Sequence, residues 1–150
     1  MITPEKLAEA GTEQAHQTAL MQWCSIRCKD EPRLKLLFAI PNGGTRHKVE
    51  AARLVASGVR AGVLDLFLPV AAPIDEWQVP TSKRYHGLFI EMKKPGRERE
   101  KNGGCSVDQI RWMGSLTDQG YKCVVCYSWQ EAARHIMQYL YGPRGLTMAL

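Results

Sequence analysis

The sequence lacks any apolar run of about 18 residues, the length that a membrane-spanning helix requires. Its first residues, MITPEKLAEAGTEQ, lack the basic and then apolar pattern of a secretory signal. No internal repeat and no low-complexity segment occurs. We therefore expect neither a membrane span nor a solenoid, and the composition favours a globular domain.

Cysteine is also too sparse for a disulfide scaffold, because the chain has five cysteines in 150 residues. An odd number fits a reduced, cytoplasmic setting better than an oxidising one. Cys123-x-x-Cys126 is half of a zinc motif, and Cys24 and Cys28 would supply a second pair. However, Cys123 and Cys126 fall in a predicted strand, where an odd separation points them to opposite faces. We interpret them as core residues, with zinc as the alternative.

The composition is that of one folded domain over residues 1–150, with a core from about 12 to 141. Hydrophobic residues make up 45% of the chain and charged residues 23%. The net charge is +5 at pH 7, which favours an anionic partner. Mild basicity is common among soluble proteins, so charge alone does not identify that partner.

Hydrophobic periodicity predicts helices and strands in the order helix, strand, helix, strand, strand, helix, strand, helix. This order indicates an α/β fold with a central mixed sheet flanked by helices. The segment 71–84 reads as a surface loop or an extended hairpin, and 144–150 as a loosely held tail. The predicted elements are Glu13–Cys28, Leu34–Ile40, Arg46–Ser57, Val63–Val70, Tyr85–Lys93, Ser106–Gln119, Tyr121–Tyr127 and Ser128–Tyr141.

Two of these apolar strands carry charges that are costly to bury. Asp65 begins the first strand, while Glu91 and Lys93 end the second and point to the same face. Carboxylates are the ligands that Mg²⁺ and Mn²⁺ prefer, and the backbone carbonyl of Met92 would add another oxygen. A lysine beside them would orient or deprotonate a water, or stabilise phosphate charge. The alternative is a solvated ion pair of little energetic value, and spacing alone favours it.

Longer stretches of the sequence resemble the VRR-NUC (virus-type replication-repair nuclease) family of the PD-(D/E)XK superfamily, most closely its stand-alone phage and bacterial members. The resemblance spans about 13 to 140, and one departure is Leu64, where the superfamily often has proline before the first acid. The stretches that carry it are IPNGGTRH, GVRAGVLDLFLP, YHGLFIEMKKPG, DQIRWMGSL and GYKCVVCYSWQEAARHIMQYL.

The resemblance implies a restriction-endonuclease-like fold and a Mg²⁺- or Mn²⁺-dependent endonuclease acting on four-way junctions or other branched DNA. It maps the metal-binding acids onto Glu13, Asp65 and Glu91, and the catalytic lysine onto Lys93. Gln109 would complete the catalytic set. Glu13 also suits a first-turn acid that complements a helix dipole, and Gln109 suits the third position of a capping box.

A symmetric cut in a two-fold junction requires two sites, and one small domain supplies one, so we expect a homodimer. Trp77 and the C-terminal tail are candidate contacts with the second subunit or with DNA. Alternatives are a catalytically idle DNA-binding module, or a flap- or sequence-specific nuclease on the same fold. His16 and His135 read as helix-surface residues.

Several basic or polar residues are candidate DNA-backbone contacts. Three of them surround a Gly-rich turn and helix start, one precedes the first charged strand, and two follow Lys93. Each is as easily read as a solvated surface side chain. They are Asn42, Arg46, Lys48, Arg60, Lys94 and Arg97.

Overall fold

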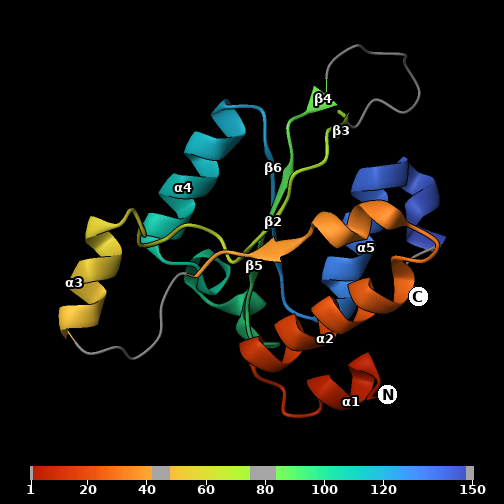
Figure 1. Ribbon diagram of the computed structural model, residues 1–150, viewed down its shortest axis with the longest axis horizontal. Coiled ribbons are helices and arrows are strands. Elements are labelled where there is room, and N and C mark those ends of the chain that lie inside the picture. Colours follow the sequence, from red (N-terminus) through yellow and green to blue (C-terminus); the bar gives the residue numbers. More distant parts are fainter. Residues whose placement is uncertain (1, 42–47, 75–83, 148–150) are drawn as a thin grey trace.

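The computed structural model describes residues 2–41, 48–74 and 84–147, and its centre is a four-stranded sheet (Figure 1). The strand order is β1-β2-β5-β6. The β1–β2 and β2–β5 pairs are antiparallel and the β5–β6 pair is parallel, so the sheet is mixed, as predicted. The strands are β1 (Phe38–Ala39), β2 (Leu66–Leu68), β5 (Leu88–Met92) and β6 (Lys122–Cys126).

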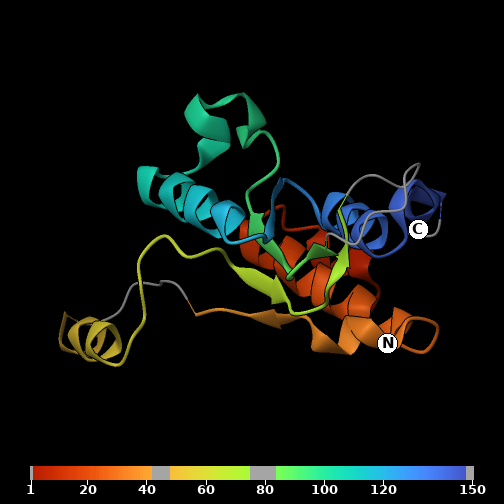
Figure 2. The ribbon, with the colours of Figure 1, turned by 90° about the horizontal axis from the view of Figure 1, so that it is seen from above.

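Helices lie on both faces of this sheet (Figure 2). The main core forms between the strands and two helices that pack on each other, α2 (Glu13–Arg27) and α5 (Trp129–Tyr141). The opposite face is partly covered by α4 (Val107–Asp118), which packs on β6. The short α1 (Pro4–Ala8) packs on α2. A helix-flanked sheet of this kind was predicted from the sequence, and the prediction is confirmed.

Alternation along β2 and β5 decides which side chains face the core. Leu66, Leu68, Leu88 and Ile90 are fully buried. Phe67 lies between the two buried leucines of β2 and is only partly buried, so it points to the opposite face. That opposite face is where the charged residues of the two strands are expected.

Helix starts follow the capping residues of the sequence. Thr12 accepts a hydrogen bond from Ala15 N at 3.1 Å. Ser106 and Gln109 form a complete capping box at the start of α4. At α5, Ser128 accepts from Glu131 N at 3.2 Å. These predicted boundaries are confirmed because local hydrogen bonds alone determine them.

The strands are shorter than predicted. The first three residues of Leu34–Ile40 belong to a 3-10 helix, Pro32–Leu36, because Pro32 begins a turn and the Glu31 side chain accepts from Arg33 N at 3.0 Å. β2 ends at Leu68 because Pro69 has no N–H for the ladder. β3 (Ala72–Pro73) and β4 (Arg84–Tyr85) pair antiparallel, so the predicted hairpin exists. Trp77 lies outside the described residues.

Two further predictions are wrong. The described part of the predicted tail, 144–147, belongs to a 3-10 helix, Gly142–Thr147, which packs on α5 because Gly145 allows close backbone approach to Met137. Residues 148–150 lie outside the described part of the chain. His16 is buried, and its Nδ1 accepts from Trp129 N at 3.3 Å. The sequence around His16 does not show that α5 packs against it, because α5 lies more than 100 residues further along the chain.

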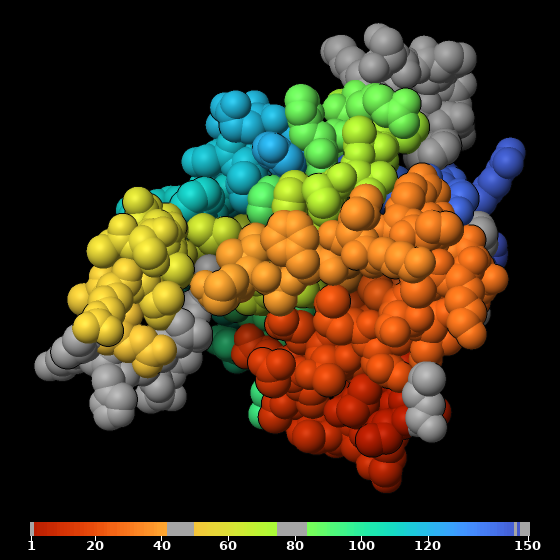
Figure 3. Space-filling model, in the orientation of Figure 1, coloured from red at the N-terminus to blue at the C-terminus, as the bar shows by residue number. Residues whose placement is uncertain are grey.

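The remaining helix, α3 (Lys48–Ala56), lies at one side of the molecule, away from the helices around the sheet (Figures 1, 2 and 3). Its C-terminal end is closed by Arg60, whose Nη1 donates to Val55 O at 3.0 Å and to Val59 O at 3.3 Å. Among the described residues, no helix is long and apolar enough to cross a membrane.

Candidate active site

Two acids face each other across the β2–β5 pair. The register joins Leu66 to Ile90, so Asp65 lies opposite Glu91 one step further along the ladder. Asp65 Oδ2 accepts from Met92 N at 2.8 Å, which anchors the carboxylate to β5. The antiparallel pairing therefore brings together two acids that are far apart in the sequence.

Glu91 and Lys93 form an ion pair almost without solvent contact. Glu91 is 1% exposed and Lys93 is 6% exposed. Lys93 Nζ lies 2.6 Å from Glu91 Oε1. A buried pair of this kind is a weak source of stability, because removing both charges from water costs about as much as their attraction returns. The solvated ion pair that the sequence left open is excluded.

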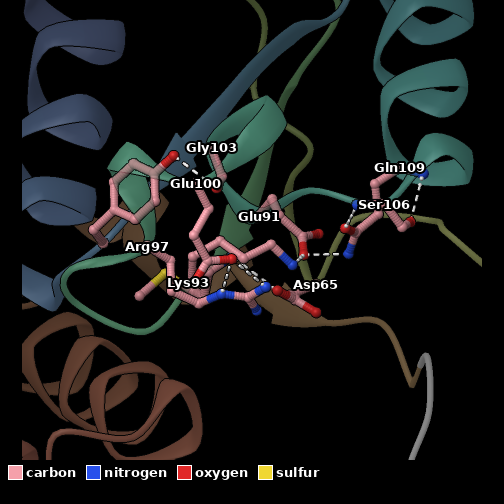
Figure 4. A network of polar contacts seen from close by, with 10 residues as sticks. Asp65, Glu91, Lys93, Arg97, Glu100, Gly103, Ser106 and Gln109 are labelled. Carbon is pink, nitrogen blue, oxygen red and sulfur yellow. Dashed lines mark hydrogen bonds and ion pairs between the residues drawn. The ribbon is translucent and has the colours of Figure 1, made fainter.

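The first turn of α4 supplies a third polar group, Gln109 (Figure 4). Its Nε2 donates a short hydrogen bond to Glu91 Oε1, while its Oε1 accepts from Ser106 N at 2.9 Å. The capping role of Gln109 is confirmed, and the same side chain contacts Glu91, while its catalytic role stays a prediction. The capping box holds the amide in the orientation that reaches Glu91.

Burial dominates the electrostatics of the site. It raises the pKa of Glu91 to about 7, with the Asp65 charge adding to the effect and Lys93 opposing it. Burial also raises the pKa of Asp65, against the hydrogen bond from Met92 and the charge of Lys93. For Lys93, burial favours the neutral amine, but the hydrogen bond and charge of Glu91 outweigh it and raise the pKa. Lys93 is thus a cation held against a carboxylate.

The donor set fits a divalent cation. Glu91 Oε2 is buried and has no hydrogen-bond partner among the described residues. Mg²⁺ is commonly held by one or two carboxylates with waters and substrate phosphates in the other positions, and Asp65 and Glu91 match that requirement. In the described part of the chain, no three His, Cys, Asp or Glu side chains converge on one metal position. Glu13 contributes to the electrostatics of Asp65 and Glu91, after larger effects, without joining such a cluster.

The predicted DNA contacts differ in their surroundings. Arg60 donates to the carbonyl of Val55 in α3 and to that of Val59 just after it, which is the structural role of a helix-end arginine. Lys94 is exposed, and Arg97 pairs with Glu100 at 2.8 Å in the turn that follows β5 (Figure 4). Asn42, Arg46 and the side chain of Lys48 lie outside the described residues.

One structural support of the site was missed in the sequence. The Tyr127 hydroxyl donates to Gly103 O at 2.9 Å and ties the turn before α4 to the end of β6 (Figure 4). A side chain at Gly103 would collide with that hydroxyl. The adjacent glycines Gly103 and Gly104 could have indicated this contact, since glycine often occurs where another group comes close to the backbone.

The cysteines do not form a zinc site. All five are free thiols, and Cys126 is fully buried whereas Cys123 is partly buried. Burial raises the pKa of Cys126, which disfavours the thiolate that zinc requires. Their prediction as core residues agrees with this arrangement.

Comparison of the sequence with protein-family models and with curated proteins gives no match. Comparison of the fold with solved structures finds a protein described as a "VRR_NUC domain protein". Its TM-score is 0.63 at 29% sequence identity, over 85% of this chain and 87% of that one. The likeness therefore covers most of both molecules.

Proposed function

We propose, from its likeness to a VRR-NUC domain protein, that the chain is a nuclease domain of that kind. More specifically, we propose a Mg²⁺- or Mn²⁺-dependent endonuclease for branched DNA. The observation that carries the proposal is the buried Glu91–Lys93 pair with the partly buried Asp65 beside it, all on one sheet face. A fold kept only for DNA binding has no need for two carboxylates in such costly surroundings.

The chemistry follows from what each residue offers. When bound by Asp65, Glu91 and the Met92 carbonyl, the divalent cation would supply Lewis acidity and lower the pKa of a bound water. Lys93, as a buried cation, is suited to stabilise negative charge on the phosphate at the reaction centre. Gln109 holds Glu91 in position through its hydrogen bond. Glu13, on the neighbouring α2, is the remaining candidate for the water or metal shell.

Substrate binding would begin outside this centre. Lys94 is exposed immediately after Lys93, and the Arg97–Glu100 pair is solvent-accessible and easily exchanged for a phosphate contact. A branched substrate cut symmetrically needs two centres, so we propose a homodimer with a two-fold interface. Light scattering of the protein with and without a four-way junction tests this, and a monomer bound to the junction contradicts it.

Cleavage is tested with labelled linear duplex, flap and four-way junction DNA, in Mg²⁺, Mn²⁺ or EDTA. We expect cleavage of branched substrates with either metal and none with EDTA. Absence of metal-dependent cleavage of every substrate would refute the enzyme proposal. Equal cleavage of linear duplex and junction would refute the preference for branched DNA.

The residue assignment is tested with Asp65→Asn. Asparagine keeps an oxygen that can accept from Met92 N, whereas alanine would leave that buried N–H unpaired. We expect cleavage to fall by at least about 1000-fold, in keeping with the loss of a metal-held charge, while the melting temperature in EDTA is unchanged. Calorimetric titration with Mn²⁺ should show weaker binding than in the wild type. If cleavage persists, Asp65 is not a metal ligand.

A further inference from the structure

A row of aromatic side chains crosses the sheet on the same face as the acids. Phe38 of β1 lies edge-on to Phe67 of β2, with ring centroids 5.8 Å apart. Phe67 stacks on Phe89 of β5 at 4.2 Å, and Tyr121, just before β6, closes the row at 5.4 Å from Phe89. We refer to these four residues as the aromatic row.

The row is open to solvent at the end formed by β1. Phe38 is 48% exposed, and Phe67 and Tyr121 are each partly exposed. Gly87 leaves room for the aromatic row, because a side chain at this position would collide with the Phe67 ring. Absence of a side chain there lets the Phe67 ring lie against the strand. An exposed, ordered aromatic surface on a sheet is a common mark of a binding site.

The aromatic row runs beside the row of acids. Phe67 of β2 is two residues from Asp65, which immediately precedes that strand, and Phe89 is two residues from Glu91 on β5. Two residues along a strand span about 7 Å. A nucleobase lies at a comparable distance from its own phosphate, so a phosphate at the acids brings its base within reach of the rings.

The surroundings of the row favour the uncharged part of a nucleotide. On this sheet face, among the described strand residues, the charges are confined to the catalytic end, at Asp65, Glu91 and Lys93. A hollow of about 330 Å³ lies near Asp65, whose backbone oxygen accepts from Ile40 N at 2.7 Å, and Ile40, Val63 and Trp112 are among its apolar lining residues. Arg60 also lines the hollow, but its Nη1 donates to the Val55 and Val59 carbonyls. A phosphate gains little from such a surface, whereas the face of a base gains stacking energy.

We propose that the aromatic row is a stacking site for an unpaired nucleobase of the DNA strand whose phosphate lies at Asp65 and Glu91. The inference rests on the nuclease function proposed above and narrows its substrate to branched DNA with an unpaired nucleotide beside the cut. A base inside a duplex has both faces covered by its neighbours. Only an unpaired or terminal base presents a free face to Phe38.

The test measures DNA binding in EDTA, so that it does not depend on cleavage. The probe is a fluorescent flap DNA with one unpaired nucleotide at the branch point, and its partner carries an abasic residue there. We expect Phe38→Ala to weaken binding of the base-containing probe by about 5- to 100-fold, the range for loss of one stacked base. Phe38→Trp should retain the affinity.

Leu36→Ala is the matched control, because Leu36 is 49% exposed and lies outside the aromatic row. It should change binding by less than about twofold, as surface substitutions usually do. The abasic probe should bind the wild type as weakly as the normal probe binds Phe38→Ala, and the two losses should not add. The dependence of binding on salt should be unchanged, because no phosphate contact is removed.

Three outcomes would overturn the inference. In the first, Phe38→Ala weakens binding of the base-containing and abasic probes equally. In the second, Phe38→Ala changes binding no more than Leu36→Ala does. Either result would show that the aromatic row does not bind the base. A change in oligomeric state with Phe38→Ala, seen by light scattering, would assign the row to a second copy of the chain. If the wild type cleaves no DNA while the base-dependent loss is found, the enzyme proposal fails and the stacking site stands.

Discussion

At the scale of single residues, the site combines side chains that are expensive to bury. Glu91 and Lys93 are nearly inaccessible, and Glu91 Oε2 has no hydrogen-bond partner among the described residues. An apolar pair of similar volume would pack at least as well. The charged pair therefore stabilises the fold little, and its cost is consistent with a role in chemistry.

This cost can be measured by removing the charges singly and together. Lys93→Met leaves the Glu91 carboxylate buried without its cation, and we expect it to lower the free energy of unfolding at pH 8 by about 3 kcal/mol. The double variant Glu91→Gln with Lys93→Met removes both charges and should recover most of that loss. Urea unfolding in EDTA provides the measurement.

The pH dependence of the stability cost of Lys93→Met provides a control. Burial already raises the pKa of Glu91 above its unfolded value, so the stability associated with this group is full below about pH 4.5 and falls as pH rises through about 7. Lys93→Met should therefore cost less at pH 5 than at pH 8. A double variant less stable than Lys93→Met at pH 8 would contradict this account.

The shared face of Glu91 and Lys93 could be predicted from the sequence because strand alternation is a local property. Glu91 and Lys93 are two residues apart and had to share a face. By contrast, Arg60 reads as a candidate phosphate contact, and only the structure shows its bonds to Val55 O and Val59 O. The burial of His16 likewise depends on a helix from the other end of the chain, which no local pattern encodes.

At the scale of elements, α4 links helix formation to the site. Its capping box uses Ser106 and Gln109, and the same Gln109 amide reaches Glu91. The helix N-terminus also carries partial positive charge, which favours a carboxylate nearby. One turn of helix thus serves both folding and the orientation of a catalytic candidate.

Two substitutions separate these functions. Ser106→Ala and Gln109→Ala should each lower the free energy of unfolding by about 1 kcal/mol, because each removes half of the capping box. Only Gln109→Ala also removes the contact with Glu91, so we expect it to reduce the cleavage rate about 10-fold or more while Ser106→Ala leaves the rate nearly unchanged. Equal rates for the two variants would restrict Gln109 to capping.

Helices were predicted more accurately than strands for a physical reason. Thr12, Ser106 and Ser128 mark helix starts through hydrogen bonds that span three residues. Strand length instead depends on partners distant in sequence. Leu34 to Leu36 resemble a strand in composition, yet they form a 3-10 turn initiated by Pro32.

At the scale of the whole molecule, a second buried acid joins segments that are more than 100 residues apart in the sequence. Glu31 is 5% exposed, binds Arg33 Nη2 at 2.6 Å, and accepts a hydrogen bond from the Tyr141 hydroxyl. The guanidinium of Arg33 also lies over the Tyr141 ring at 5.1 Å. The network connects the segment after α2 to the end of α5.

This network predicts a loss of stability in acid. The hydrogen bond from Arg33 lowers the pKa of Glu31 to about 2, below its unfolded value. Its contribution is therefore full above about pH 4.5 and is lost as pH falls towards 2. With allowance for solvent screening at the partly exposed Arg33, we expect about 1 to 2 kcal/mol.

Glu31→Gln tests the size and sign. The variant should be less stable than the wild type at pH 7, and the difference should shrink as pH falls from 4.5 to 2, measured by urea unfolding. Tyr127→Phe is a control, because its hydroxyl bonds Gly103 rather than Glu31. A difference that stays constant with pH would exclude Glu31 as the titrating group.

The arrangement of acids and rings on alternate positions has an evolutionary consequence. Asp65 and Phe67 share one parity along β2, as do Phe89 and Glu91 along β5. A one-residue insertion or deletion between the acid and the ring in either segment would put the two on opposite faces, and one of them would point into the leucine core. Point substitutions can change acid and ring separately, but such a length change breaks their alignment, so the spacing between them should vary less among descendants of this chain than the residues themselves.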